Sequence, residues 1–215
     1  CLGFKGMARR FAVHDHFRNT RKLNVNVIGI EARQHLAAAC SDIAAAGESD
    51  GLIFIAGTIE NAPVADIDIL IALHACDTAT DDALYRGISS KAELIIAAPC
   101  CHRELRRQMK APTLLRNILK HPTVAERMAE MLTDGMRSLL LESVGYSTKV
   151  FEFISPEHTP KNNMIAATKR RHGSSAAAIR DEIERLKAEF GIEHQRLDEL
   201  LRANAEPLTT TAEQV

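Results

Sequence analysis

Short apolar runs alternate along this chain with stretches of helical periodicity. The runs occupy residues 24–31, 51–59, 67–73 and 92–98, and the last two are continuous rather than alternating and are followed by small, polar or reactive residues. Runs of this length are typical of strands buried on both faces of a parallel sheet. The segments between them, at 33–46 and 78–87, are rich in alanine or carry acids in a first helical turn. This order predicts a doubly wound α/β fold.

The second half of the chain is predicted to be mainly helical. Helices are expected over 102–109, 112–121 and 122–143. Two strand-like segments, 148–154 and 163–168, follow, and the turn-rich residues between them predict a hairpin at a sheet edge.

An amphipathic stretch over 179–201 comes near the end of the chain. Ile179, Ile183, Leu186 and Phe190 share one helix face, which indicates packing on the domain or on a partner helix, including self-association. We therefore predict one domain over residues 1–170 and a helical extension with a polar, disordered tail over 171–215.

Length and charge narrow the class of protein. With 215 residues the chain can bury a full core, and its 27 basic and 28 acidic residues carry no overall signal for nucleic acid. No segment reads as a membrane span or a signal peptide, so no membrane association is expected. Five cysteines, an odd number, indicate reduced thiols and a cytoplasmic setting. Because residue 1 is Cys rather than Met, we expect a fragment or a processed chain.

Reactive side chains follow the third and fourth apolar runs. The carboxyl ends of adjacent parallel strands are where open α/β sheets bind ligands, so these side chains mark a candidate site. They are His74, Cys76, Asp77, Pro99, Cys100, Cys101 and His102.

Four interpretations of this cluster stay open. It could be a zinc site, a thiolate activated by histidine, a pocket for cofactor and substrate, or a set of buried small hydrophobes. Zinc is disfavoured because paired C-x₂-C spacing is absent and the consecutive Cys100 and Cys101 are expected to diverge, so no metal is predicted. We favour the pocket for His74 and Asp77, and simple burial for one of the two adjacent cysteines.

Upstream residues have the pattern of a nucleotide-type site. Glu31 ends a strand and is placed to accept hydrogen bonds from a ribose diol, or else it is a surface acid that caps the next helix. Thr58 and Ile59 close the second strand and could bracket an adenine ring, or form an ordinary turn. Gly3 and Gly6 suggest a glycine loop that leads into a helix over 7–21, or a terminal turn.

A basic run lies directly beside the cysteine cluster. It could hold RNA phosphate, although basic runs are more often solvated helix faces. Its first members are Arg103, Arg106, Arg107 and Lys110.

Four motifs in this order resemble a known family. They are Gly29-Ile-Glu31-Ala-Arg33, Leu73-His74-Ala-Cys76-Asp77, Pro99-Cys100-Cys101-His102 and His158-Thr-Pro-Lys161-Asn162. Together they resemble the class I S-adenosylmethionine-dependent methyltransferase domains of uncharacterised bacterial proteins and of eukaryotic relatives described as ribosomal RNA adenine dimethylase domain-containing. The resemblance covers about residues 1–170.

The resemblance implies a fold and a cofactor. It implies a Rossmann-like sheet of the seven-stranded type with a terminal antiparallel hairpin, S-adenosylmethionine with Glu31 on its ribose, and a pocket lined by Cys76, Pro99, Cys100 and Cys101. His74 and Asp77 would lie near the methionine part and the acceptor. Members open with an acid-ended strand and a glycine-rich loop, which Cys1, Gly3, Lys5 and Gly6 follow only in part. The first, central strand is therefore expected to be missing here.

The expected activity is methyl transfer from S-adenosylmethionine to an acceptor, with RNA or protein favoured. The chemistry is an in-line displacement at a sulfonium, which needs a base only if the acceptor arrives protonated; His74, Asp77 and His102 are the candidates. The alternative is a non-catalytic methyltransferase-like interaction module. A nicotinamide-dependent oxidoreductase is disfavoured because a G-x-G-x-x-G motif is lacking.

Overall fold

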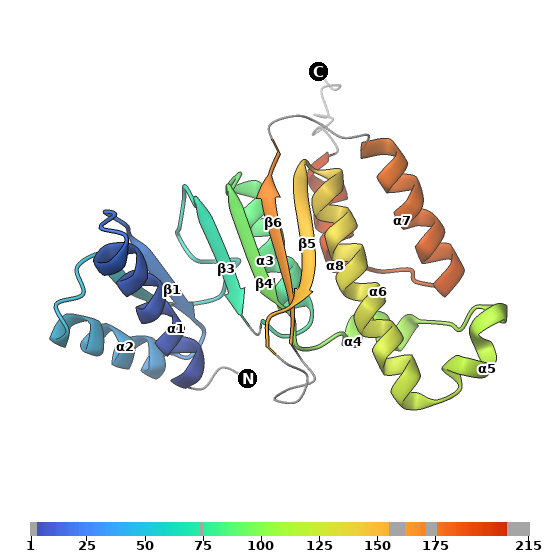
Figure 1. Ribbon diagram of the computed structural model, residues 1–215, viewed down its shortest axis with the longest axis horizontal. Helices are drawn as coiled ribbons and strands as arrows, with labels where there is room; N and C mark the ends of the chain where they lie inside the picture. The colour runs from blue at the N-terminus through green and yellow to red at the C-terminus, as the bar shows by residue number, and fades with distance from the viewer. Residues whose placement is uncertain (1–3, 74, 155–161, 171–175, 206–215) are drawn as a thin grey trace, which may run out of the picture. The chain divides into compact units, whose positions relative to one another are not determined.

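The computed structural model describes residues 4–73, 75–154, 162–170 and 176–205. By internal contacts the chain divides into two compact units, Cys1–Ala65 and Asp66–Val215, each of which is described by itself below (Figure 1). Gly3, His74, the 155–161 turn and the polar tail from residue 206 lie outside the described residues.

The first unit is a two-stranded parallel sheet with one helical segment before the first strand and one between the two strands. α1 (Phe4–Asp15) continues into one π-helical turn (His16–Thr20), and β1 (Val27–Glu31), α2 (Gln34–Ala46) and β2 (Leu52–Ala56) follow. The register pairs Val27 with Leu52 and Glu31 with Ala56, so both strands end at the same edge. The predicted strands and the predicted α2 are thus confirmed to within about three residues.

The core of the first unit rests on one close approach between helix α1 and the sheet. A Cβ added to Gly29 would lie 2.6 Å from Phe54 Cδ1 and 2.7 Å from Arg10 Cδ. Phe11 stacks obliquely on Phe54 with ring centroids 5.4 Å apart. Glycine at this point of β1 therefore lets α1 and the β2 aromatic ring reach the strand. The rest of the core consists of Val27, Leu36, Cys40, Ala44 and Leu52.

The predicted glycine loop at the start of the chain is wrong at Gly6. Gly6 lies inside α1, which begins at Phe4, three residues before the expected helix start. A single glycine costs a helix only about 1 kcal/mol relative to alanine, and the neighbouring Lys5, Met7 and Ala8 are strong helix formers. The α-helix also ends at Asp15 rather than at Arg21, because the next residues form the π-helical turn.

The second unit contains a four-stranded mixed sheet. Its strands are β3 (Ile69–Leu73), β4 (Leu94–Ala98), β5 (Tyr146–Glu152) and β6 (Asn163–Lys169), in the order β3-β4-β6-β5 (Figure 1). β3 and β4 are parallel, whereas β6 is antiparallel to both β4 and β5. The β5–β6 hairpin and its edge position confirm the prediction made from the alternating segments.

The helices of the second unit follow the predicted order. They are α3 (Thr78–Ser89), α4 (Arg103–Gln108), a 3₁₀ turn (Thr113–Leu115), α5 (Arg116–Leu119), α6 (Pro122–Ser143), α7 (Ala176–Phe190) and α8 (Arg196–Ala205). α3 comes so close to the sheet that a Cβ on Gly87 would lie 2.7 Å from Ile95. Ser138 of α6 bonds to Thr148 of β5, which the register places on the same sheet face as Ile95. α3 and α6 therefore cover one face together.

The amphipathic stretch near the chain end packs within the second unit. Ile183 and Leu197 are fully buried, α7 lies against α6, and α8 contacts α3. Buried Asp198 accepts hydrogen bonds from Arg180, Lys187 and Arg202, which tie the two helices to each other. Of the two interpretations of the 179–201 stripe, the structure favours packing on the domain over a partner helix.

The described residues hold six strands in two sheets, rather than one continuous sheet of seven. The α/β class with parallel β1–β2 and β3–β4 pairs is as predicted, but β1 and β3 each keep one edge without a strand partner among these strands. No helix in the described part of the chain is both long and apolar enough to cross a membrane.

Candidate functional site

The candidate residues of the first unit meet at the carboxyl edge of its two strands. Glu31 ends β1 and is 6% exposed, and its backbone carbonyl accepts a hydrogen bond of 3.0 Å from the Gly57 amide just after β2. This bond holds the turn with exposed Thr58 and half-buried Ile59 next to the strand end. The structure therefore brings Glu31, Thr58 and Ile59 to one edge, as their order in the sequence predicts.

The Glu31 carboxylate is held by its neighbour Arg33. Arg33 Nε donates to Oε1 at 2.7 Å, Nη2 donates to Oε2 at 3.2 Å, and the Arg33 amide also donates to Oε1. These bonds lower the pKa of Glu31 below its ordinary value even though burial opposes them. Glu31 is therefore an ionised, acceptor-only group, while the Arg33 side chain that covers it is 42% exposed.

Arg10 of α1 lies against β1. Its Nη2 donates to the Ile30 carbonyl at 2.8 Å, whereas Nη1 is buried with no hydrogen-bond partner among the described residues. Burial lowers the pKa of Arg10, and the charge of Glu31 acts against this shift. Arg10 Nη1 thus has donor capacity to spare next to β1, the strand that ends at Glu31.

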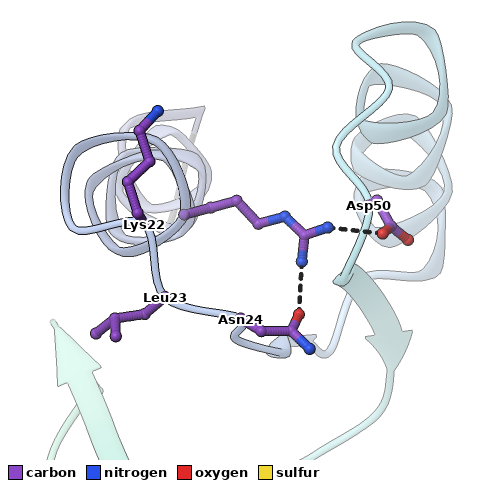
Figure 2. Close-up of a pocket in the computed structure, with 5 residues that line it drawn as sticks. Lys22, Leu23, Asn24 and Asp50 are labelled. Atoms are coloured by element: carbon purple, nitrogen blue, oxygen red, sulfur yellow. Dashed lines mark hydrogen bonds and ion pairs between the residues drawn. The ribbon is translucent and has the colours of Figure 1, made fainter.

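A hollow of about 490 Å³ in the first unit lies at the opposite ends of the strands. Figure 2 shows Lys22, Leu23, Asn24 and Asp50 around it. Arg18 bridges its walls, with Nη1 donating to Asn24 Oδ1 at 2.9 Å and Nη2 donating to Asp50 Oδ2 at 2.8 Å. Because these segments precede β1 and β2, the hollow is separate from the strand end that carries Glu31.

In the second unit the loops after β3 and β4 lie side by side. The register pairs Leu73 with Ala98, so the segments that follow leave the sheet together. Glu104 donates its backbone amide to Asp77 Oδ1 at 3.1 Å, which joins the two loops. Cys76, Asp77 and the Pro99–His102 segment are thereby gathered at one edge; His74, their predicted companion, is not among the described residues.

Asp77 adopts a backbone conformation that a non-glycine residue rarely takes. Its φ is 54° and its ψ is −123°, just before α3. Such a conformation costs on the order of 1–3 kcal/mol and persists only where the surroundings hold it. Here Arg137 Nη2 donates to its carbonyl at 3.0 Å, while its carboxylate accepts the Glu104 amide. The loop that presents Asp77 is therefore fixed from two sides.

Three thiols come together between these loops. Cys76 Sγ lies 3.7 Å from Cys100 Sγ, which lies 3.7 Å from Cys101 Sγ, and all three sulfur atoms are within 4.8 Å of one another. Burial, reinforced by the neighbouring thiols, raises the pKa of Cys100 to about 12. The expectation that consecutive Cys100 and Cys101 diverge is wrong, because the irregular backbone between β4 and α4 turns both sulfurs the same way. Three clustered soft ligands can hold a thiophilic metal ion.

His102 is buried beside the same loop. Its Nε2 lies 3.0 Å from Asp134 Oδ1, and its Nδ1 has no hydrogen-bond partner among the described residues. Only 4% of the residue is exposed. Its predicted role as a base stays a prediction, and the Asp134 pairing shows how the ring is oriented.

A buried network of charged residues, centred on Arg137 of α6, lies next to the loops after β3 and β4. Arg137 is 1% exposed and grips Asp81 of α3 with two bonds, Nε to Oδ1 at 3.0 Å and Nη2 to Oδ2 at 2.6 Å. Its Nη1 lies 3.4 Å from Asp134 Oδ1, and Gln195 Nε2 donates to Asp81 Oδ1 at 2.7 Å. The network connects α3, α6 and the start of α8 to the Asp77 and His102 loops.

Glu104 is the perturbed acid of this region. Burial, together with the charge of Asp81, raises its pKa to about 7, although the Arg196 amide bonds to Oε1 at 3.0 Å. Its Oε2 is buried without a partner among the described residues. A carboxyl group that titrates near neutral pH thus lies one residue beyond the α4 start.

Sequence reasoning missed Arg33, Glu104 and the Arg137 network. Asp81 resembled an ordinary first-turn acid of α3, and Glu104 a surface residue of a basic helix. One signal was available: Arg137 falls four residues after Thr133 and four before Leu141, on the buried stripe of α6. A charged residue on an apolar stripe predicts a buried partner.

The basic run beside the site is only partly available for a ligand. Arg103, Arg107 and Lys110 are exposed. Arg106 lies 3.4 Å from Glu126 in a half-exposed ion pair. The predicted RNA contact stays a prediction.

Comparison with known proteins yields a family match and three weak structural resemblances. Residues 10–108 match the family model of a methyltransferase domain. Among solved structures, the methyltransferase domain of bacterial CtHen1-C is 9% identical over 77% of this chain and 98% of its own (TM-score 0.46). The PH0226 protein of Pyrococcus horikoshii is 10% identical over 78% of this chain and 92% of its own (TM-score 0.41). The YcgJ protein of Bacillus subtilis is 10% identical over 68% of this chain and 83% of its own (TM-score 0.36).

No curated protein matches the chain significantly. The family match spans α1 to α4, and so it includes Glu31, Asp77 and the three clustered thiols. This part of the chain is therefore similar to a methyltransferase domain.

Proposed function

We propose that this protein transfers a methyl group from S-adenosylmethionine to an RNA or protein acceptor. The observation that carries the proposal is the methyltransferase family match over residues 10–108. The positions of the polar residues support it, because in each unit they lie at the carboxyl edge of parallel strands, where open α/β sheets bind ligands.

The first-unit edge suits the nucleoside part of the cofactor. Ionised Glu31 is an acceptor-only group of the kind that a ribose diol requires, and Thr58 with Ile59 would flank the base. Arg33 gives two hydrogen bonds to Oε1, from its amide and its Nε, and one to Oε2, which leaves acceptor capacity on Oε2. Gly3 and His74, two further residues predicted to bind the cofactor, lie outside the described residues.

In the second unit, the residues predicted to act on the acceptor lie at the carboxyl edge of β3 and β4. The bound cofactor supplies an electrophilic methyl group, and the residues of this chain position the acceptor and exclude water. Asp77, held by Arg137 and Glu104, is the fixed carboxylate in the loop after β3. It would orient a donor group on the acceptor, or take its proton where the acceptor arrives protonated.

A non-catalytic interaction module is the second candidate. The observation that favours it is the Glu31–Arg33 pairing, because both carboxylate oxygens already carry guanidinium bonds and the carboxylate side chain is only 5% exposed. In that case Arg33 would be a permanent structural partner of Glu31, and S-adenosylmethionine would not bind.

Titration calorimetry with S-adenosylmethionine and S-adenosylhomocysteine separates the two candidates. The proposal expects binding by the whole chain and a roughly 10- to 100-fold weaker affinity for Glu31→Ala, since a hydrogen bond to a charged group contributes about 1.5–3 kcal/mol. The matched control is Asp42→Ala, which removes an exposed acid from α2 and should bind as the wild type does. Absence of heat at high micromolar ligand with the wild-type chain would overturn the methyltransferase proposal.

A further inference from the structure

The three-thiol cluster of the second unit has the dimensions of a metal site. Sulfur ligands of a tetrahedral zinc ion, with Zn–S bonds of about 2.3 Å, lie about 3.8 Å apart. In this chain the Cys76–Cys100 and Cys100–Cys101 sulfur separations are both 3.7 Å, and the third pair is within 4.8 Å. An ion could therefore be bound with little movement of the three side chains.

We propose that Cys76, Cys100 and Cys101 form a zinc site with three thiolate ligands and a fourth position open to water or another small ligand. This site goes beyond the proposed methyl transfer and does not depend on it. Three protein ligands and one exchangeable position are the arrangement of zinc sites that keep the metal accessible.

The scaffold around the cluster holds the ligand loops in place before any ion arrives. Cys76 comes from the loop after β3 and the other two thiols from the loop after β4. The Glu104 amide bond to Asp77 ties the loops together, and Thr80 Oγ1 donates to the Ala75 carbonyl at 2.6 Å. Arg137 fixes the Asp77 carbonyl from below. A prearranged site loses less conformational entropy when it binds its ion.

The chemistry of the three side chains suits a divalent cation, because thiolates are preferred ligands of zinc. A divalent ion supplies the positive charge that a coordinated thiolate needs, and it deprotonates its sulfur ligands outright. The half-buried position of all three cysteines leaves a path for the ion and for its fourth ligand.

The binding step balances without any redox partner. Three S–H bonds break, three Zn–S bonds form, and three protons pass to solvent, while zinc stays Zn²⁺. With a neutral water as fourth ligand, the site carries a net charge of −1. Zinc binding by the stripped protein should therefore release about three protons per ion near neutral pH.

The direct test uses the whole chain, reduced and stripped with a chelator, and Co²⁺ as a spectroscopic probe. We expect a thiolate-to-cobalt charge-transfer band and tetrahedral d–d bands that saturate at one Co²⁺ per chain and are abolished by Zn²⁺. Cys76→Ser, Cys100→Ser and Cys101→Ser should each weaken binding by at least roughly 10-fold, as loss of a thiolate ligand requires. Cys40→Ala is the matched control, because Cys40 is a buried thiol of the first unit and its loss should leave the bands unchanged.

A second measurement does not require the variants to fold. X-ray absorption of the zinc-loaded wild-type protein should show three sulfur neighbours at about 2.3 Å and one lighter atom. A first shell without sulfur would overturn the proposal, as would a reduced, folded protein that binds neither Co²⁺ nor Zn²⁺. The proposal would also be overturned if the reduced protein rapidly reoxidised to a Cys76–Cys100 disulfide and took up no metal.

Discussion

Two glutamates near the candidate sites are held in opposite electrostatic states. Glu31 ends β1 in the first unit, and hydrogen bonds from Arg33, two residues away, lower its pKa. Glu104 follows β4 in the second unit, and burial with the charge of Asp81 raises its pKa to about 7. The first acid keeps its charge because a neighbour in sequence supplies the partner. The second titrates near pH 7 because the fold buries it and brings Asp81 close to it.

The same contrast extends to what stabilises each unit. The first unit is held mainly by apolar contacts between α1, α2 and two strands, and its charged pairs are short-range or exposed. The second unit buries Arg137, Asp81 and Asp134 at 2% exposure or less. Burying charges is costly unless each has its partner, so the second unit depends on a complete network and the first does not.

The largest expected effect is on the buried network. Arg137→Met leaves Asp81 buried without its counter-ion and removes one of the partners of Asp134, and should lower the free energy of unfolding by about 3–5 kcal/mol. Tyrosine fluorescence in urea reports on this unit alone, because Tyr85 and Tyr146 are the two tyrosines of the chain and tryptophan is absent.

The matched control for this substitution is Arg106→Met. Arg106 pairs with Glu126 on the surface, so this change should cost about 0–1 kcal/mol. Adding Asp81→Asn to Arg137→Met should recover part of the stability. Equal costs for the two arginine substitutions would contradict the division between buried and exposed pairs.

The next effect concerns the packing of the first unit. Gly29→Ala places a Cβ 2.6 Å from Phe54, which should destabilise this unit by about 1–3 kcal/mol through overpacking. Amide hydrogen exchange of β1 and β2 measures the change. Gly135→Ala, in an open position of α6, should instead stabilise the second unit by about 0.5–1 kcal/mol. Unchanged exchange in Gly29→Ala would mean that the close approach is not needed.

A pH series sharpens the comparison between the two acids. Because the folded pKa of Glu104, about 7, lies above its ordinary 4.5, the folded state binds more protons between these values. This contribution is fully present below about 4.5 and is lost as the pH rises through 7. Relative to Glu104→Gln, the wild type should therefore lose stability across that window, as followed by urea unfolding. Parallel profiles for the two proteins would show that Glu104 titrates normally.

The smallest effect is expected at Arg33. Arg33→Ala removes the side-chain bonds and the charge that lower the pKa of Glu31, so burial is opposed only by the backbone amide of residue 33 and by Arg10, and this pKa should rise. Carboxyl NMR measures the shift. The Glu31 contribution to stability, present above pH 4.5 and lost on acidification, should shrink with it. An unmoved Glu31 pKa would mean that another group, such as Arg10, holds the charge.

The order of strands and helices was readable because it depends on local patterns. Continuous apolar runs predicted β1 to β4, alternation predicted the β5–β6 hairpin, and Gly145 and Pro122 marked the limits of α6. Gly6 went against its local pattern, since its helix-forming neighbours outweigh one glycine. The placing of Glu31, Asp77 and the cysteines at strand ends could also be predicted, because strand direction fixes which ends share an edge.

The sequence by itself determined the α/β order, the amphipathic closing helices and the concentration of thiols after two adjacent strands. Only the tertiary structure decided that Cys100 and Cys101 turn their sulfurs toward Cys76, that Arg137 lies beneath Asp77, and that Glu104 titrates near neutral pH. The physical reason is the range of the interactions. Periodicity reflects contacts within a few residues, whereas Arg137 and Asp81 are 56 residues apart, and their energy exists only once the fold excludes water.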